Sequence, residues 1–295
     1  MNASVTAPVM ITGAAGQLGY ELQRTAPSGT VILAVDIADL DLTDVAATES
    51  FVARHQPRVI INGAAYTAVD RAESEPDMAE VVNVTAAATL ATAAKRQRAR
   101  MVQISTDFVF GAGNGTPWKT SDLTDPQSQY GRTKRDGERA VLDVLGTDAL
   151  VIRTAWLYSA HGGNFVKTML RLMTERDEVR VIADQVGTPT WANSLARTVW
   201  AAVEHPGVSG VLHWTDAGVA SWYDFAVAIQ EEAVARRLLT RAVPIHAIAT
   251  SDYPTPARRP TYSVLEKNDT VALLGVKPNH WRTNLRHMLD ELVNV

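Results

Sequence analysis

Short runs of aliphatic and β-branched residues alternate, in the first half of the chain, with longer stretches whose apolar positions recur at helical spacing. The runs have strand length, and the stretches between them predict helices, including a long one over about 78–96. This alternation predicts an α/β fold, a Rossmann-type doubly wound parallel sheet with helices on both faces. The predicted strands are residues 9–12, 31–35, 58–62, 101–104 and 150–152.

The rhythm changes after Arg153. Single strands predicted at 179–182 and 210–214 interleave there with helices and Pro-containing loops. We therefore expect a dinucleotide-binding domain over 1–154 and a smaller mixed α/β domain over 155–295 that binds the substrate. Later segments near 181–190 and 223–247 are expected to return to the first domain. Four tryptophans lie in apolar patterns and are predicted to pack the second domain: Trp200, Trp214, Trp222 and Trp281.

A glycine-rich turn follows the first predicted strand and opens the first predicted helix. It contains Gly13, Gly16 and Gly19. Glycine permits the tight turn, lets the backbone approach a pyrophosphate, and allows the helix to pack closely on the strand. A pyrophosphate bound there would meet the free N–H groups of a helix N-terminus. In this context the turn predicts a dinucleotide site.

An acidic residue, Asp36, ends the second predicted strand. It lies near the spacing at which such folds place a carboxylate on the adenosine ribose. A carboxylate repels a 2′-phosphate, and no Arg or Lys lies between 36 and 50 to offset that repulsion. Asp36 therefore favours NADH, and NADPH stays open. Asp41 suits contact with the adenine, although a helix cap is an equally ordinary role for the neighbouring Thr43 or Asp44.

Tyr130 and Lys134 lie four residues apart in a stretch that predicts a helix, so their side chains share one face. An ammonium near a phenol stabilises the phenolate and lowers the pKa of the tyrosine from about 10. Such a tyrosine exchanges a proton with a carbonyl or alcohol oxygen near neutral pH. The same spacing is common on solvated amphipathic helices, so the assignment depends on the other motifs.

Composition and charge exclude several classes of function. The net charge of −4 gives no electrostatic footprint for nucleic acid or an anionic membrane. The 295 residues include no Cys, which excludes thiol nucleophiles, thiolate metal sites and disulfides and suits a reducing cytosol. The His residues lack metal-ligand spacing, so we predict no catalytic metal. We expect a cytoplasmic enzyme without nucleic-acid or membrane partners.

A series of motifs in a fixed order resembles the extended short-chain dehydrogenase/reductases and, among them, the dTDP-4-dehydrorhamnose reductase family. The resemblance runs from about Met10 to the C-terminus. Any one motif could arise by chance, but their common order is not expected by chance. The motifs are residues 13–19, 62–76, 105–110, 130–138, 153–158, 164–170, 184–190 and 253–260.

The resemblance implies that NADH or NADPH reduces the C4 ketone of dTDP-4-dehydro-L-rhamnose to give dTDP-L-rhamnose, the last step of dTDP-rhamnose biosynthesis. Tyr130 would donate a proton to the C4 oxygen, and Lys134 would hold the nicotinamide ribose and depress the tyrosine pKa. Thr106 would hydrogen-bond the reacting oxygen. The resemblance places further cofactor contacts at Gly13, Gly16, Gln17, Leu18, Gly19, Asp36, Asp41, Leu42, Ala65, Tyr66, Thr67 and Ile104, and further substrate contacts at Asp107, Val69, Trp156 and Arg259.

The chain departs from the family at residue 108 and in the turn over 111–115, and the first of these departures helps to separate the alternatives. Phe108 stands where these reductases usually carry Tyr, and where a sugar-nucleotide 4,6-dehydratase carries the Glu that it needs. The missing second carboxylate therefore argues against dehydration. A sugar-nucleotide C4-epimerase remains open. So does a non-catalytic regulatory subunit of a methionine adenosyltransferase, although an intact set of Thr106, Tyr130 and Lys134 argues against a mere binding module. We expect a monomer or a homodimer.

Overall fold

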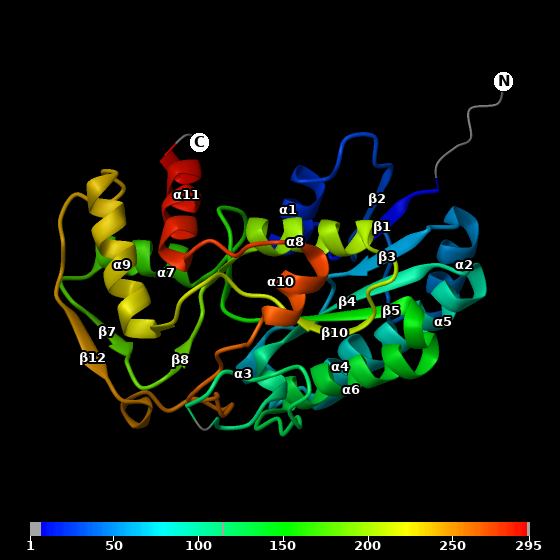
Figure 1. The fold of residues 1–295 in the computed structure, drawn as a ribbon. Coiled ribbons are helices and arrows are strands. Elements are labelled where there is room, and N and C mark those ends of the chain that lie inside the picture. Colours follow the sequence, from blue (N-terminus) through cyan, green and yellow to red (C-terminus); the bar gives the residue numbers. More distant parts are fainter. Residues whose placement is uncertain (1–6, 114, 294–295) are drawn as a thin grey trace.

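The computed structural model of the protein describes residues 7–113 and 115–293. Six strands form a central sheet in the order β10-β5-β4-β3-β1-β2, and every neighbouring pair is parallel (Figure 1). The five predicted strands are confirmed, and a sixth, β10, joins their edge. Their bounds are β1 Val9–Thr12, β2 Ile32–Val35, β3 Val59–Asn62, β4 Arg100–Thr106, β5 Ala149–Thr154 and β10 Gly210–His213.

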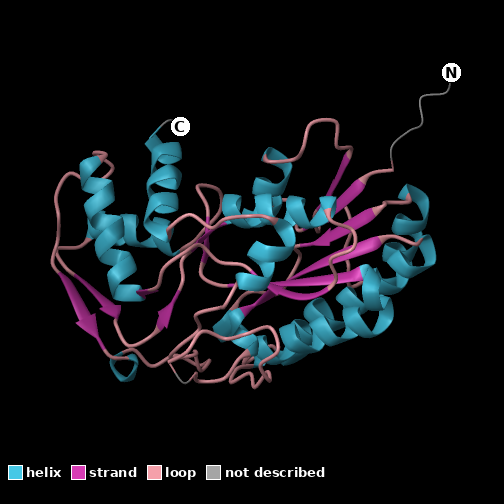
Figure 2. Ribbon diagram, in the orientation of Figure 1, coloured by secondary structure: helices cyan, strands magenta, loops and turns pink. Residues whose placement is uncertain are grey.

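Helices cover both faces of this sheet, as predicted (Figure 2). One face packs against α1 (Gln17–Arg24), α8 (Ala192–Glu204) and α10 (Asn268–Leu274). The other packs against α2 (Val45–His55), α5 (Ala86–Gln97) and α6 (Gln129–Leu145). The inner strands β1, β3 and β5 read as largely apolar runs because both of their faces are buried.

The helix that carries Tyr130 and Lys134, α6, is confirmed, and its N-terminus is fixed from two directions. The Ser128 hydroxyl accepts a hydrogen bond from the N–H of Gly131 (3.2 Å), a normal N-terminal cap. Glu73 Oε1 accepts from the N–H of Gln129 (2.7 Å). Glu73, which ends the short helix α3 (Val69–Ala72), thereby ties that helix to the first turn of α6.

The long helix predicted over 78–96 consists of three joined pieces. α4 (Pro76–Glu80) begins with a proline at its first position, where the missing N–H costs nothing. A π-helical turn over Val81–Thr85 follows, and α5 completes the run. π-turns within α-helices are frequent at functional sites. This one points the Asn83 side chain at the loop after β3 and at α6.

A smaller lobe has its own core. β7 and β12 form a parallel pair, and α7, α9 and α11 pack around it (Figure 1). β6 pairs with β9 and β8 pairs with β11. β9 contacts both α8 and α11, and the short helix α3 contacts α6. The bounds are α3 Val69–Ala72, β6 Leu157–Tyr158, α7 Phe165–Glu175, β7 Val179–Ile182, β8 Val186–Gly187, β9 Thr190–Trp191, β11 Ala220–Ser221, α9 Trp222–Ala235, β12 Ile245–Ile248 and α11 Trp281–Val293.

The chain returns to the large sheet at a different place from the one expected. The segments near 181–190 and 223–247 contribute to the smaller lobe, because β7 and β12 pair with each other beneath α9. The returning segment is α8 with β10, whose residues 210–213 pair with β5. Trp200 and Trp214 accordingly pack the core of the large sheet, and Trp281 packs the smaller lobe. The outer ends of the two expected domains, 1–6 and 294–295, lie outside the described residues.

Candidate active site

A cleft of about 890 Å³ opens at the carboxyl ends of the large sheet's strands. β1 lies between β3 and β2 in the sheet. The chain passes from β1 to β2 on one side and then crosses to β3 on the other, which makes the carboxyl ends of β1 and β3 the topological switch point where such sheets bind ligands. Loops of the smaller lobe form the opposite wall. The lining includes every predicted site residue except Tyr66: Gly13, Gly16, Gln17, Leu18, Gly19, Asp36, Asp41, Leu42, Ala65, Thr67, Val69, Ile104, Thr106, Asp107, Tyr130, Lys134, Trp156 and Arg259.

The glycines at one end of the cleft are required by close backbone contacts. Gly13 has φ +66°, and a Cβ there would stand 2.9 Å from the backbone N of Ala64. A Cβ on Gly19 would stand 2.2 Å from the carbonyl oxygen of Gly13. No L-residue with a side chain fits at either position without moving the backbone. The turn therefore brings β1, α1 and the loop after β3 together.

The N-terminus of α1 is open toward the cleft. Its N-cap is Gly16, which has no side chain to satisfy the first N–H groups. Among the described residues, the N–H groups of Gln17, Leu18 and Gly19 have no hydrogen-bond partner. Free N–H groups and the positive end of the helix dipole suit an anion. These residues fit the pyrophosphate of a dinucleotide.

Asp36 stands beside this turn. Its Oδ2 accepts from the N–H of Ala15 (2.7 Å) and its Oδ1 from the N–H of Ile37 (2.8 Å). The carboxylate is thus fixed at the cleft with lone pairs left for ribose hydroxyls. Asp41 makes a local turn, in which its Oδ1 accepts from the N–H (2.9 Å) and the hydroxyl (2.7 Å) of Thr43, and these bonds lower the Asp41 pKa. Asp44 caps α2 through Ala47.

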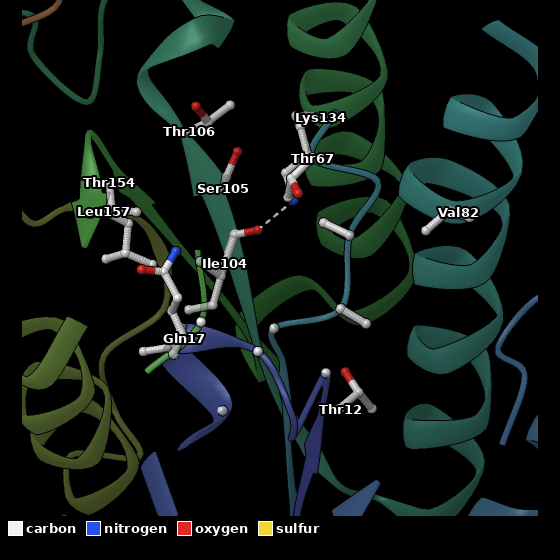
Figure 3. A pocket seen from close by; sticks show the side chains of 18 of the residues that line it. Thr12, Gln17, Thr67, Val82, Ile104, Ser105, Thr106, Lys134, Thr154 and Leu157 are labelled. Carbon is white, nitrogen blue, oxygen red and sulfur yellow. Dashed lines mark hydrogen bonds between the residues drawn. The ribbon is translucent and has the colours of Figure 1, made fainter. Parts of the chain in front are cut away.

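Lys134 reaches across from α6 to the end of β4, where its Nζ donates to the carbonyl of Ile104 (2.8 Å; Figure 3). A chain of buried side chains reaches the same carbonyl beneath the cleft. Thr12 donates to Asn62 (2.6 Å), Asn62 to Gln103 (2.8 Å), and Gln103 to Ile104 O (3.1 Å). The ammonium is therefore held in place by the ends of three adjacent strands.

The predicted pKa of Tyr130 is wrong in direction. The pKa of Tyr130 is raised to about 12, chiefly by burial; a hydrogen bond with Thr106 lowers it in part, and the nearby Asp107 carboxylate contributes to the rise. Burial also lowers the pKa of Lys134 to about 8, opposed by the negative charge of Glu138. The removal of the phenol and the ammonium from water outweighs the attraction that their spacing on the helix suggests. A phenol with this pKa is a proton donor at neutral pH.

Hydroxyl groups gather where β4 and β5 end. The Thr106 hydroxyl donates to Asp107 Oδ1 (3.0 Å) and accepts from the N–H of Phe108 (3.2 Å). Burial raises the pKa of Asp107 to about 6, against hydrogen bonds from Ser263 and Thr106. Ser105 and Thr154 are buried, line the cleft, and have no hydroxyl partner among the described residues. Buried hydroxyls without partners indicate where a polar ligand binds.

Tyr66 turns away from the cleft. Its hydroxyl donates to Glu75 Oε2 (2.5 Å), and its backbone N–H donates to Asn83 Oδ1 (2.9 Å). Asn83 also donates to the Thr133 hydroxyl on α6 (3.0 Å). The sequence reasoning missed Asn83, because the π-turn that aims it has no distinct sequence pattern. Asn83 positions both the loop after β3 and the helix that carries Tyr130 and Lys134.

Aromatic residues form the wall contributed by the smaller lobe. Trp156 has a left-handed backbone (φ +47°), and its ring stacks on Trp222 with centroids 3.5 Å apart. A Cβ on Gly187 would stand 2.7 Å from the Trp156 ring. Trp222 packs against the core of the smaller lobe, as predicted, and also lines the cleft. Beside this wall, Arg259 pairs with Asp70 of α3 (2.7 Å).

Two kinds of feature are absent from the part of the chain that the structure describes. No helix there is long and apolar enough to cross a membrane. Nor do three or more His, Asp or Glu side chains come together there in a way that could hold a metal ion.

Comparisons with known proteins agree with this arrangement. The family described as "RmlD substrate binding domain" matches residues 7–294. A dTDP-4-dehydrorhamnose reductase of Aggregatibacter actinomycetemcomitans is 39% identical over 289 residues, covering 96% of this chain and 98% of that protein. The structure resembles that of a Clostridium acetobutylicum dTDP-4-dehydrorhamnose reductase (TM-score 0.91, 40% identity, 97% and 99% of the two chains). It equally resembles a Bacillus anthracis dTDP-4-dehydrorhamnose reductase in complex with NADP (TM-score 0.91, 34% identity, 97% and 99%).

Proposed function

Because the chain belongs to the RmlD family, whose members include dTDP-4-dehydrorhamnose reductases, we propose that it reduces the C4 ketone of dTDP-4-dehydro-L-rhamnose to give dTDP-L-rhamnose. The enzyme is an NAD(P)H-dependent oxidoreductase. The observation that carries the proposal is a buried phenol, Tyr130, in the same cleft as a glycine turn that fits a dinucleotide. The product belongs to dTDP-rhamnose and polysaccharide biosynthesis.

The residues that line the cleft have different roles in the proposed reaction. NADH or NADPH supplies the hydride. Tyr130 gives its proton to the C4 oxygen as charge develops there, and Thr106 holds that oxygen by a hydrogen bond. Lys134 supports the cofactor's ribose and keeps positive charge near the phenol. Asp107, Val69, Trp156 and Arg259 contact the sugar nucleotide.

Asp36 bears on the choice between the two cofactors. Lys134 and Arg259 are the only Lys or Arg side chains that line the cleft among the described residues, and neither belongs to the segment around Asp36. A 2′-phosphate beside Asp36 therefore meets a carboxylate without a compensating cation from the lining. We propose that the enzyme accepts both cofactors and prefers NADH.

The experiment that tests the function follows cofactor oxidation at 340 nm with dTDP-4-dehydro-L-rhamnose, using NADH and NADPH in parallel. Formation of dTDP-L-rhamnose is verified by NMR. Stoichiometric oxidation with either cofactor supports the proposal. Absence of turnover with both cofactors would refute the proposed reductase activity. A higher kcat/KM with NADPH than with NADH would refute the preference for NADH that is assigned to Asp36.

The pKa values predict a simple pH profile for this reaction. Lys134 has a pKa of about 8 and must carry its proton to act as a cation, so kcat/KM should fall as pH rises through about 8. Tyr130, at about 12, keeps its proton throughout and adds no second limb below pH 10. We expect a plateau below pH 7.5 and a decline above pH 8.5, measured from pH 6.5 to 10. A constant rate up to pH 10 would show that the lysine charge is not required.

A C4-epimerase is the alternative within the fold. An epimerase keeps its dinucleotide and regenerates it, so the purified protein would carry NAD and interconvert sugar nucleotides without net oxidation. A regulatory subunit would bind a methionine adenosyltransferase and oxidise no cofactor. Thr106, Tyr130 and Lys134 together in one buried site favour catalysis over the regulatory subunit. The reductase is favoured over the epimerase because the reductases compared above are 34–40% identical to this chain, whereas a UDP-glucose 4-epimerase of the same fold is 18% identical.

The remaining assignments follow from the same proposal. The large sheet forms the dinucleotide-binding domain and the smaller lobe contributes most of the sugar-nucleotide site, with α8 and β10 belonging to the former. We propose a cytoplasmic enzyme, monomeric or homodimeric, that binds no nucleic acid and requires no metal for the chemical step.

A further inference from the structure

The rim of the cleft carries an ion pair between two distant segments. Asp70 lies on α3, directly after the loop that follows β3, and Arg259 lies 189 residues later in the loop 253–260. The guanidinium is held end-on: Nη2 donates to Asp70 Oδ2 (2.7 Å) and Nη1 to Asp70 Oδ1 (3.1 Å). Asp70 Oδ1 also accepts from the N–H of Ala257 (3.2 Å).

We propose that Asp70 is a positioning residue, which orients Arg259 so that its free edge receives the diphosphate of the sugar nucleotide. The proposal rests on the proposed function in its choice of substrate. It assigns no chemical step to Asp70, which acts only through Arg259.

The hydrogen bonds of Arg259 show which edge is free. Besides Asp70, Nη1 donates to the Thr255 hydroxyl (2.6 Å) and to the carbonyl of Ala257 (3.1 Å). Nε and the second N–H of Nη2 have no partner among the described residues. These two N–H groups lie on the same edge of the planar guanidinium, in the fork geometry that binds two oxygens of a phosphate. Asp70 therefore occupies one edge and leaves the other intact.

The surroundings support the same assignment. Arg259 lines the cleft, and the side chain before Asp70, Val69, lines it too. The Arg259 side chain is 24% exposed, so the pair is neither fully buried nor freely solvated. The Asp70 pKa is lowered, chiefly by the hydrogen bond from Arg259, so the carboxylate stays charged at neutral pH. An arginine on a proline-containing loop would otherwise sample many rotamers, and fixing it in advance reduces the entropy lost on binding.

The test uses Asp70→Asn, which keeps the shape of the side chain but replaces one acceptor oxygen with an N–H₂ group that faces the guanidinium. The Kd for dTDP, measured by titration calorimetry, and the KM for the sugar nucleotide should both rise about tenfold. The kcat and the Kd for NADH should change less than twofold. Arg71→Gln is the matched control, because Arg71 is adjacent on α3, is 70% exposed and pairs with Glu75 outside the cleft. It should leave all four constants unchanged.

A double-mutant cycle separates positioning from a merely structural role. In an Arg259→Met background the effect of Asp70→Asn on dTDP binding should vanish, whereas general damage to the fold would persist there. Tighter dTDP binding by Asp70→Asn would overturn the proposal, since it would mean that Asp70 competes with the diphosphate. Unchanged binding, or a wild type that does not bind dTDP, would also overturn it. Because dTDP binding needs no turnover, a wild type that binds dTDP but reduces no keto sugar would refute the reductase and leave the role of Asp70 standing.

Discussion

Tyr130→Phe is expected to lower kcat for reduction of the keto sugar by about a thousandfold, within the range that general acids contribute. The substitution removes one oxygen from a ring that is 9% exposed and packs edge-on against Phe108 (5.5 Å). The apolar packing is kept, so the fold and the affinity for NADH should be retained. What is lost is the proton donor, whose high pKa keeps it protonated at neutral pH. Stopped-flow cofactor oxidation and fluorescence titration with NADH measure the two quantities separately.

The control for this variant is Tyr20→Phe. Tyr20 lies on α1, is 40% exposed, and stacks on His161 through its ring (4.4 Å), so loss of its hydroxyl should change kcat less than twofold. Turnover by Tyr130→Phe within tenfold of wild type would mean that another group, or water, delivers the proton. A large rise in the Kd for NADH would instead assign Tyr130 to cofactor binding.

The large sheet could be predicted from the sequence because its inner strands β1, β3 and β5 are buried on both faces. Their runs are apolar without alternation, and the Gly13 to Gly19 turn and Asp36 mark the ends of the first two strands. The dinucleotide end of the cleft depends on backbone shape, which glycine spacing records directly. That is why nearly all of the predicted cofactor residues line the cleft.

Other features depend on contacts that no local pattern records. Tyr66 follows β3 as expected, but Glu75 and Asn83 turn it away from the cleft. The apolar run at 210–213 gives no sign of whether it pairs with β5 or within the smaller lobe. The pKa of Tyr130 depends on burial, which is a property of the packed molecule. The four-residue spacing places the phenol and the ammonium on one face of a helix, but it does not show how far each group is buried from solvent.

The second large effect is expected for the buried ion pair beneath the catalytic helix. Arg153 of β5 makes two hydrogen bonds to Glu138 of α6 (Nε to Oε1, 2.9 Å; Nη2 to Oε2, 2.7 Å), and the two side chains are 5% and 3% exposed. The guanidinium also lies over the Phe110 ring (5.0 Å). Together with burial, its charge lowers the pKa of His213 to about 3 and keeps that imidazole neutral. The pair thus fixes α6 to the sheet one turn beyond Lys134.

Arg153→Met should lower the free energy of unfolding by about 3–5 kcal/mol, because it leaves the Glu138 carboxylate buried without a partner. The double variant Arg153→Met/Glu138→Leu should recover most of that loss, since it removes the unpaired charge and keeps apolar volume. Urea unfolding followed by circular dichroism measures both. The exposed pair Arg171 and Glu175, at 59% and 52% exposure, provides the control, and Arg171→Met should cost less than about 0.5 kcal/mol.

The pair also connects stability to catalysis. The negative charge of Glu138 raises the pKa of Lys134 against the effect of burial, so Glu138→Gln should move the alkaline decline of kcat/KM to lower pH. If Arg153→Met lowered the free energy of unfolding no more than Arg171→Met does, the Glu138 carboxylate would have become hydrated or protonated in the variant. The ion pair would then not be what holds α6 against β5. If Glu138→Gln left the pH profile in place, the charge of Lys134 would be set by groups other than the carboxylate one turn away.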